Sequence, residues 1–152
     1  MLIDAHAHID KYEESLEVAL EEIKKYKIFT ISTSMDIPSF EKNLKIHEKC
    51  EFVFPIFGIH PWNASDYVDR LQDLSPVIEN SPIIGEVGLD HHFVEDTSQY
   101  EAQLKVFEFF LSSAKKQNKI VNLHTKGAER EILNLLIHYG IQQQIIRVVI
   151  DG

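Results

Sequence analysis

The sequence predicts an α/β fold built on a parallel β-sheet of the (β/α) TIM-barrel type, in an incomplete form. Short apolar runs of β character alternate with longer runs of helical periodicity along the chain, and this alternation is typical of βαβ units with parallel strands. The rhythm accounts for about five βα units and a sixth strand within 152 residues. Since no Gly/Ser-rich linker or low-complexity segment interrupts it, we expect residues 1–152 to form a single domain.

The individual elements follow from the apolar pattern. Strands are expected at Met1–Ala5, Ile28–Thr33, Phe52–Phe57, Ile83–Glu86, Ile120–Leu123 and Ile145–Ile150. Helices are expected at Glu13–Lys25, Ile37–Lys49, Tyr67–Glu79, Gln99–Gln117 and Ala128–His138. The fourth helix has the clearest pattern, with apolar residues on one face at Leu104, Phe107, Phe110, Leu111 and Ala114. Pro38, Pro76 and Gly140 fall where helices begin or end.

The length of the chain leaves two architectures open. A complete (β/α)8 barrel typically needs ~250 residues, so the sequence is either a fragment of a barrel or an open, doubly wound sheet. An open half-barrel leaves strand edges unpaired. We therefore expect a free monomer of this kind to be marginally stable or to self-associate.

Composition excludes several classes of protein. No apolar run approaches the ~20 residues that span a bilayer, and no basic and apolar leader opens the chain, so a cytoplasmic protein without membrane contacts is expected. The formal net charge of −9 disfavours broad electrostatic binding to nucleic acid, although bound cations can reverse the field locally. Cys50 is the only cysteine, which rules out a disulfide within the chain, and we expect it to pack as a small apolar residue.

The strongest local motif is the pair His6 and His8 at the end of the first predicted strand. Side chains alternate along a strand, so both imidazoles lie on the same side, ~6.6 Å apart along the backbone. Two imidazoles so placed can close on one cation, and imidazole suits zinc and similar divalent metals. The alternative is two histidines that merely end a strand.

Two further apolar strands end in residues that bind metals. Glu86 ends one of them between Gly85 and Gly88, and a carboxylate there would be costly to bury unpaired; it could bridge two metals, while Asp90 could order the loop or a ligand. His124 follows the strand Ile120–Leu123. Active sites of parallel α/β folds form at the carboxyl ends of the strands, so the coincidence predicts a metal site more firmly than any single motif.

Other polar residues are weaker candidates. His60 follows a fourth strand and could contact a phosphate or act as a general acid or base, with a turn residue beside Pro61 as the alternative. Lys126 is a candidate partner for an anionic substrate oxygen. Of His91 and His92, at least one is expected to be a surface residue. His47 and His138 lie within predicted helices and are expected to be structural or exposed.

Together these motifs resemble the TatD-like metal-dependent deoxyribonucleases, a family within the amidohydrolase-type barrels. Residues 2–10 (LIDAHAHID) are similar to the first signature of that family, and residues 58–62 (GIHPW) and 84–90 (IGEVGLD) to the next two, in the right order. Residues 103–114 are similar to the amphipathic helix that precedes the fifth strand of the family. The resemblance spans nearly the whole chain.

The resemblance implies roles for individual residues. His6 and His8 would bind one metal, Glu86 would bridge two, and His124 would bind the second, with two divalent ions as cofactors (zinc, manganese, magnesium or iron). His60 and His92 would lie at the substrate phosphate. His60, Glu86 and His92 are thus the expected catalytic residues, and Lys126 joins His60 and His92 in binding substrate.

The sequence departs from the family at two places. Around His124 the family usually has proline before the strand and arginine two residues after the histidine, where this chain has Lys119 and Lys126; lysine cannot reproduce the bidentate phosphate contact of arginine. A histidine expected near position 151 is replaced by Asp151, which could still bind a cation, and a later aspartate has no counterpart here. We therefore expect the 152-residue chain alone to be a poor catalyst.

Three functions remain open. The first is hydrolysis of phosphodiester bonds in DNA by a metal-activated water. The second is hydrolysis of an amide, lactone or phosphoester of a small molecule, because metal ligation alone does not choose between electrophiles. The third is a non-catalytic metal-binding scaffold.

Overall fold

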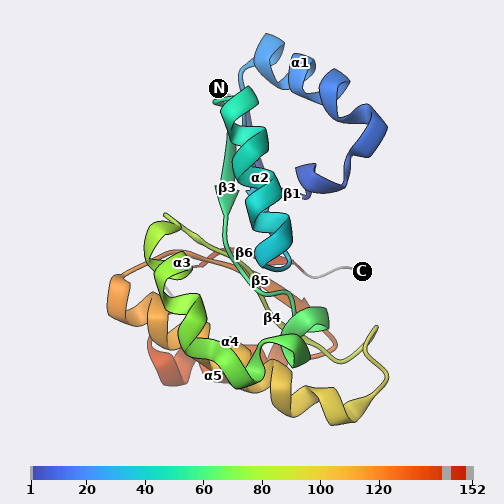
Figure 1. Ribbon diagram of the computed structural model, residues 1–152. Helices are drawn as coiled ribbons and strands as arrows, with labels where there is room; N and C mark the ends of the chain where they lie inside the picture. The colour runs from blue at the N-terminus through green and yellow to red at the C-terminus, as the bar shows by residue number, and fades with distance from the viewer. Residues whose placement is uncertain (1, 142–144, 150–152) are drawn as a thin grey trace.

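A computed structural model describes residues 2–141 and 145–149, with side chains through residue 141. The strands are β1 (Leu2–Ala7), β2 (Ile28–Thr33), β3 (Val53–Ile56), β4 (Ile84–Asp90), β5 (Val121–Lys126) and β6 (Ile145–Val149). The α-helices are α1 (Leu16–Tyr26), α2 (Ile37–Lys49), α3 (Ser75–Asn80), α4 (Tyr100–Gln117) and α5 (Glu129–Tyr139). Strands and helices alternate along the chain, as the sequence predicts (Figure 1).

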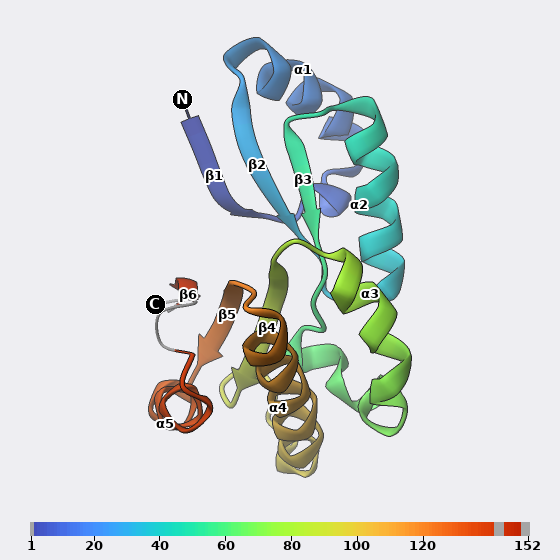
Figure 2. The same ribbon diagram turned by 90° about the vertical axis from the view of Figure 1, so that its left-hand side faces the viewer.

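The strands form two parallel sheets, in the orders β1-β2-β3 and β4-β5-β6. One bridge between Phe57 and Ile84 connects the sheets, so the strands follow one another in chain order (Figure 2). A doubly wound sheet reverses its order at a switch point, and the described strands contain no such reversal. The architecture is therefore that of a TIM-barrel-like sheet that does not close within the described residues.

Gly58 and Gly85 allow the two sheets to meet at this bridge. A Cβ atom on Gly58 would lie 2.6 Å from the carbonyl carbon of Gly85, and one on Gly85 would lie 2.9 Å from the nitrogen of Gly58. Side chains at either position would push the strands apart. This contact keeps His60, which follows β3, close to Glu86 on β4.

The helices lie against the strands that precede or follow them. α1 packs on β2, α2 on β3, α4 on β4 and α5 on β5. Asp36 and Ser39 cap the start of α2 reciprocally: the Ser39 amide donates to Asp36 Oδ1 at 2.8 Å, and the Asp36 amide donates to Ser39 Oγ at 3.0 Å. The larger apolar core is centred on Phe57, Phe107 and Phe110, which are fully buried.

Some predicted boundaries are wrong. The expected helix Tyr67–Glu79 is a 3-10 segment, Val68–Leu74, followed by the short helix α3. The segment is kinked at Arg70, whose backbone is not helical, and Pro76 favours a new helix start because it lacks an N–H and holds a helical φ. In the first predicted helix, residues 13–15 form a separate 3-10 turn before α1.

The strands that carry the predicted ligands also run further than expected. β4 continues to Asp90 and β5 to Lys126. Glu86 therefore lies within its strand rather than at its end, and His124 lies within its strand rather than after it. His6 likewise lies inside β1, and only His8 follows it. In the carboxyl-terminal part of β4, Val87 and Leu89 belong to the apolar core, whereas Glu86 and Asp90 contact the histidines of the site.

Two residues noted in the sequence have clear structural roles. Cys50 is buried in a small apolar cluster with Ile46 and Val53, as predicted. The ammonium group of Lys119 donates to the carbonyl oxygens of Ile78, of Glu79 at 2.8 Å and of Ser81 at 2.7 Å. It thus satisfies the free carbonyls at the end of α3 and ties that helix to the start of β5.

The open side of the first sheet is apolar. A hollow of about 430 Å³ is lined by Ile3, Phe29, Ile31, Phe54, Ile56, Pro82 and Ile83. Ile3 is 60% exposed there. The self-association expected of an open half-barrel stays a prediction. Within the described residues, no helix combines the length and the apolar character needed to cross a membrane.

Candidate metal centre

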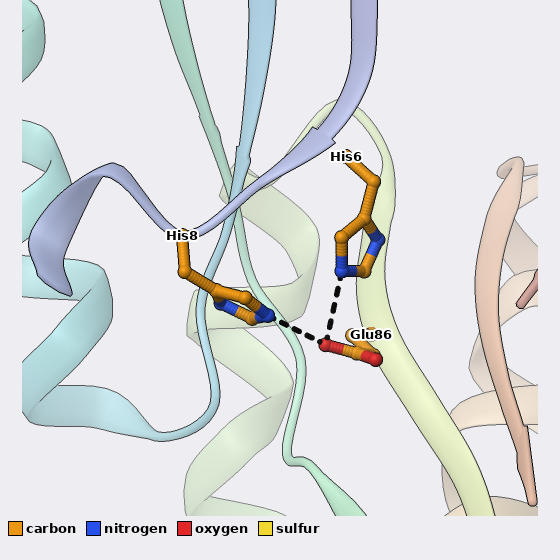
Figure 3. A group of neighbouring side chains, drawn as sticks. All are labelled: His6, His8 and Glu86. Atoms are coloured by element: carbon orange, nitrogen blue, oxygen red, sulfur yellow. Dashed lines mark ion pairs between the residues drawn. The ribbon is translucent and has the colours of Figure 1, made fainter. Parts of the chain in front are cut away.

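The site gathers where β1, β4 and β5 converge. β1 and the residue after it supply His6 and His8, β4 supplies Glu86, and β5 supplies His124. Figure 3 shows both N-terminal imidazoles pointing toward the Glu86 carboxylate. Together with His60, these residues form two triads whose side-chain atoms lie close enough to hold a metal ion: His6–His8–Glu86 and His60–Glu86–His124.

The first triad is centred on one oxygen of Glu86. Oε2 lies 3.3 Å from His6 Nε2 and 3.1 Å from His8 Nε2 (Figure 3). The opposite ring nitrogens face acceptors: His6 Nδ1 lies 3.3 Å from Asn122 Oδ1, and His8 Nδ1 lies 3.0 Å from the carbonyl oxygen of Thr33. Each Nδ1 therefore carries the proton in the neutral ring, and the Nε2 lone pairs are available to a metal.

The second triad uses the other carboxylate oxygen. Glu86 Oε1 lies 3.1 Å from His124 Nδ1 and 3.8 Å from His60 Nε2. His124 Nε2 lies 3.1 Å from Asp90 Oδ2, a carboxylate that accepts its proton and leaves Nδ1 free to bind a metal. Glu86 thus presents one oxygen to each group of histidines, as a bridging ligand would.

His60 differs from the other histidines in which nitrogen carries the proton. Its Nδ1 accepts a hydrogen bond from the backbone amide of Trp62 at 3.2 Å. The proton of the neutral ring is therefore on Nε2, which lies 3.2 Å from His124 Nδ1. A protonated nitrogen donates a hydrogen bond and cannot bind a metal, so the structure favours His60 as a donor to substrate over His60 as a ligand.

The ligand groups fit a divalent ion. Tetrahedral zinc with bonds of about 2.0–2.1 Å separates its ligand atoms by ~3.3 Å, close to the 3.1 and 3.3 Å between Glu86 Oε2 and the two imidazoles. Among the described atoms, Oε2 is buried and accepts no hydrogen bond of regular geometry despite these neighbours. Two nitrogens and a carboxylate oxygen arranged in this way suit a cation between them.

The charges of the cluster are strongly coupled. Burial by itself would raise the pKa of Glu86, but the adjacent imidazoles of His124, His6 and His8 outweigh it and hold that pKa well below its usual range. The neighbouring Glu86 carboxylate raises the pKa of His8. Burial by itself would lower the pKa of His124, but the carboxylates of Glu86 and Asp90 together outweigh it and raise that pKa. Burial lowers the pKa of His60 to about 4.

His60 should make the stability of the metal-free chain depend on pH. Between pH 6.5, its ordinary pKa, and about 4, the unfolded chain binds a proton at this position and the folded chain does not. The contribution of His60 is therefore present above pH 6.5 and lost as the pH falls toward 4, by about 3 kcal/mol. His8 and His124 act in the opposite direction, since their stabilisation is present below pH 6.5 and is lost as the pH rises through their raised pKa values.

Urea unfolding at several pH values, with a chelator present, measures this effect. We expect His60→Gln to flatten the fall in unfolding free energy between pH 6.5 and 4, and His138→Gln, on the exposed face of α5, to leave it unchanged. An unaltered pH profile in His60→Gln would contradict the assignment of this group.

The remaining predicted residues lie at or beyond the edge of this cluster. His92 is exposed, and its backbone amide donates to Asp90 Oδ1 at 2.9 Å. Lys126 is half-buried, with its ammonium nitrogen 5.5 Å from the centre of the Phe93 ring. Asp151 lies outside the described residues. The substrate contacts expected of His92 and Lys126 stay predictions.

The other histidines are placed as expected. His91 stacks on Tyr100 with ring centres 3.9 Å apart. His47 Nδ1 lies 2.6 Å from the carbonyl oxygen of Val53, a contact that joins α2 to β3. His138 is exposed on α5.

Asp90, named from the sequence as a residue that could order a ligand, contacts His124, but sequence reasoning missed the contacts of Asn122 and Trp62. The side chain of Asn122 is fully buried beside His6, and its amide nitrogen donates to the carbonyl oxygen of Ala5 at 3.2 Å, which fixes its orientation. The indole nitrogen of Trp62 donates to Asp90 Oδ2 at 2.7 Å. A polar residue at position 122, inside an otherwise apolar strand, was the available signal for the first of these.

The chain is similar to known proteins of one family. The family model described as "TatD related DNase" matches residues 3–150. The chain is 32% identical to human "Deoxyribonuclease TATDN3", over 99% of this chain and 61% of that protein. It is 30% identical to "Uncharacterized metal-dependent hydrolase YabD" of Bacillus subtilis, over 93% of this chain and 57% of that protein. The chain thus spans about 60% of the length of these relatives.

Solved structures show the same fold. The crystal structure of the TatD homologue YJJV from Escherichia coli superposes with a TM-score of 0.76 and 21% identity, over 94% of this chain and 57% of that one. A TatD family hydrolase from Entamoeba histolytica gives a TM-score of 0.77 at 20% identity, over 94% of this chain and 56% of that one. Because the family model matches residues 3–150 of this chain, the chain belongs to the TatD related DNase family of metal-dependent hydrolases.

Proposed function

We propose that this chain carries the metal-binding residues of a nuclease that hydrolyses phosphodiester bonds in DNA. The observation that carries the proposal is the division of one buried carboxylate between two groups of imidazoles, with Glu86 Oε2 facing His6 and His8 and Oε1 facing His124. A bridging carboxylate with histidines on both sides suits a pair of divalent ions. The name of the human relative, a deoxyribonuclease, supports DNA as the substrate.

Each residue of the site has a separate task in this reaction. Bound divalent ions would supply a nucleophilic water at neutral pH and neutralise charge on the phosphoryl oxygens. His6, His8, Glu86 and His124 would hold them. Nε2–H of His60 would donate a hydrogen bond to a phosphate oxygen, and its lowered pKa keeps the ring neutral during turnover.

Asp90 and Asn122 would act on these ligands without touching substrate. Asp90 accepts from His124 Nε2 at 3.1 Å, and Asn122 Oδ1 lies 3.3 Å from His6 Nδ1. Such outer contacts hold a ligand ring in one tautomer and one orientation. Lys126 would supply a point charge near the substrate, where the family usually has arginine.

Measurement of bound metal tests the first half of the proposal. We expect near-stoichiometric divalent metal in the purified chain by elemental analysis, and its loss in His6→Ala, with folding of the variant checked by circular dichroism. His138→Ala, an exposed histidine on α5, is the matched control and should keep its metal. A folded His6→Ala variant that retains its metal would contradict the assignment of this site.

Hydrolysis assays test the second half. With metal present, the chain is expected to cleave single-stranded DNA only slowly, with this turnover lost in His6→Ala and retained in His138→Ala. A panel of small phosphoesters, amides and lactones separates nucleases from other hydrolases. Turnover of that panel without DNA cleavage would replace DNA by a small-molecule substrate, and a metal-loaded chain inactive on every substrate would favour the scaffold.

A further inference from the structure

A row of aromatic rings leads from the candidate metal centre to the surface. The ring centres of His124 and His60 are 4.4 Å apart, those of His60 and Trp62 are 4.7 Å apart, and those of Trp62 and Phe93 are 6.1 Å apart. The exposed fraction rises along the row, from 3% at His124 and 4% at His60 to 48% at Trp62 and 57% at Phe93. The two outer rings therefore form an exposed aromatic step directly beside the buried ligands.

One buried carboxylate holds this step in place. Asp90 Oδ2 accepts the indole proton of Trp62 at 2.7 Å, and Oδ1 accepts the backbone amide of Phe93 at 2.7 Å. Asp90 is itself fully buried and contacts His124. The same group that orients a candidate metal ligand thus also orients the Trp62 ring and fixes the backbone at Phe93, so the Trp62 ring has little conformational freedom to lose when a ligand binds.

The surroundings of the step suit an anionic aromatic ligand. Lys126 lies 5.5 Å from the centre of the Phe93 ring, and the imidazole of His92 lies 4.7 Å from it. Trp62 and Phe93 are nearly perpendicular, at 81°. Nucleobases stack on exposed aromatic side chains in proteins that bind single strands, where cations alongside face the phosphates. The net charge of −9 makes such local contacts more important, because the chain as a whole repels DNA.

We propose that Trp62 and Phe93 form a stacking platform for an unpaired nucleobase whose adjoining phosphate lies at the metal centre. This inference rests on the proposed nuclease function and adds two side chains that would bind the base beside the phosphate. A base in a duplex is already stacked and paired, so it reaches the platform only where the strand is single or frayed.

Trp62 is the only tryptophan in the sequence, so its fluorescence reports binding at this place. The probe is a phosphorothioate oligothymidylate, whose linkages resist hydrolysis, titrated with Mg²⁺ and separately with a chelator. The comparison ligands are an abasic oligodeoxyribonucleotide with the same number of phosphates and a blunt duplex. We expect saturable quenching by the oligothymidylate in at least one of the two conditions, and on the order of tenfold weaker binding of the abasic strand and the duplex.

Variants at Phe93 separate stacking from general apolar contact. Phe93→Leu keeps an apolar side chain without an aromatic face and should weaken oligothymidylate binding on the order of tenfold, whereas Phe93→Tyr should restore it. Neither should change binding of the abasic strand. The matched control is Tyr26→Leu, since Tyr26 is 55% exposed at the end of α1 beneath Lys25, with 4.9 Å between the ammonium nitrogen and the ring centre; it should leave binding unchanged.

The outcomes distinguish the platform from the nuclease function. Base-dependent quenching that Phe93→Leu weakens would support the platform, even if the chain cleaves no DNA, in which case only the nuclease proposal falls. Equal binding of oligothymidylate and the abasic strand, or a Phe93→Leu variant that binds both as the wild type does, would overturn the platform. DNA cleavage alongside either of these results would leave the nuclease proposal intact.

Discussion

Glu86→Gln is expected to remove bound divalent metal from the chain and to abolish metal-dependent hydrolysis. Glu86 is the one residue that contributes to both triads, with a separate oxygen toward each group of histidines. Glutamine has nearly the same shape but neutral charge, and its NH2 group has no lone pair for a metal. At most one group of histidines would then still face an oxygen.

The expected loss of metal affinity exceeds the loss caused by removing a residue that only hydrogen-bonds to a metal ligand. Loss of a hydrogen-bond partner of a ligand costs about 10- to 100-fold in metal affinity, so loss of a shared ligand should cost more than about 100-fold. Isothermal titration with Zn²⁺ or Mn²⁺ measures this directly. Glu101→Gln is the matched control, because Glu101 is exposed on α4 and pairs only with Lys105 among the contacts described for it; its metal affinity should equal that of the wild type.

The same variant has a consequence in the metal-free chain. The raised pKa values of His8 and His124 depend on the Glu86 carboxylate, so both should fall in Glu86→Gln. Titration of the imidazole protons by NMR, in the presence of a chelator, reports these values without any catalysis. Unchanged histidine titrations together with unchanged metal affinity would show that Glu86 does not face these rings.

Gly88→Ala is expected to destabilise the fold more than any surface substitution. Gly88 pairs with His124 in the β4–β5 ladder and has a φ of +155°. A Cβ atom here would lie 1.9 Å from the carbonyl oxygen of His124 and 2.9 Å from its carbonyl carbon. Both are backbone atoms, which cannot rotate away, so the two strands would have to separate.

We expect a loss of at least about 4 kcal/mol in the free energy of unfolding, which is exceptional for one methyl group. Such a loss is a large part of the total stability of an ordinary domain, and any folded remainder should bind metal weakly because His124 is displaced from Glu86. Urea denaturation followed by circular dichroism measures the change.

Gly140→Ala is the matched control for this substitution. Gly140 also has a positive φ, of +68°, but a Cβ atom there would meet only the flexible end of Lys115 at 3.9 Å. The backbone strain alone should cost about 1 kcal/mol. If Gly88→Ala lost no more stability than Gly140→Ala, the close approach of β4 and β5 at this position would be contradicted.

Much of the fold follows from local patterns. The helix Ile37–Lys49 was predicted with its observed bounds, because Pro38 marks its start and the apolar residues keep one period. All six strands were located, since short apolar runs that alternate with helical patterns are typical of the strands of βαβ units. The prediction of an α-helix across Val68–Leu74 was wrong, because the 3-10 geometry of this segment and its kink at Arg70 depend on packing that the apolar periodicity does not record.

For the site, the sequence by itself determined the candidate ligands, and only the tertiary structure decided how they meet. Histidine and carboxylate at the ends of successive apolar strands were enough to name His6, His8, Glu86 and His124, since parallel strands bring their carboxyl ends together. The division of the two Glu86 oxygens, the proton on His60 Nε2 and the role of Asn122 depend on contacts between residues up to 117 positions apart. Distances of that kind are set by strand register and by the approach of Gly88 to His124, which no local pattern encodes.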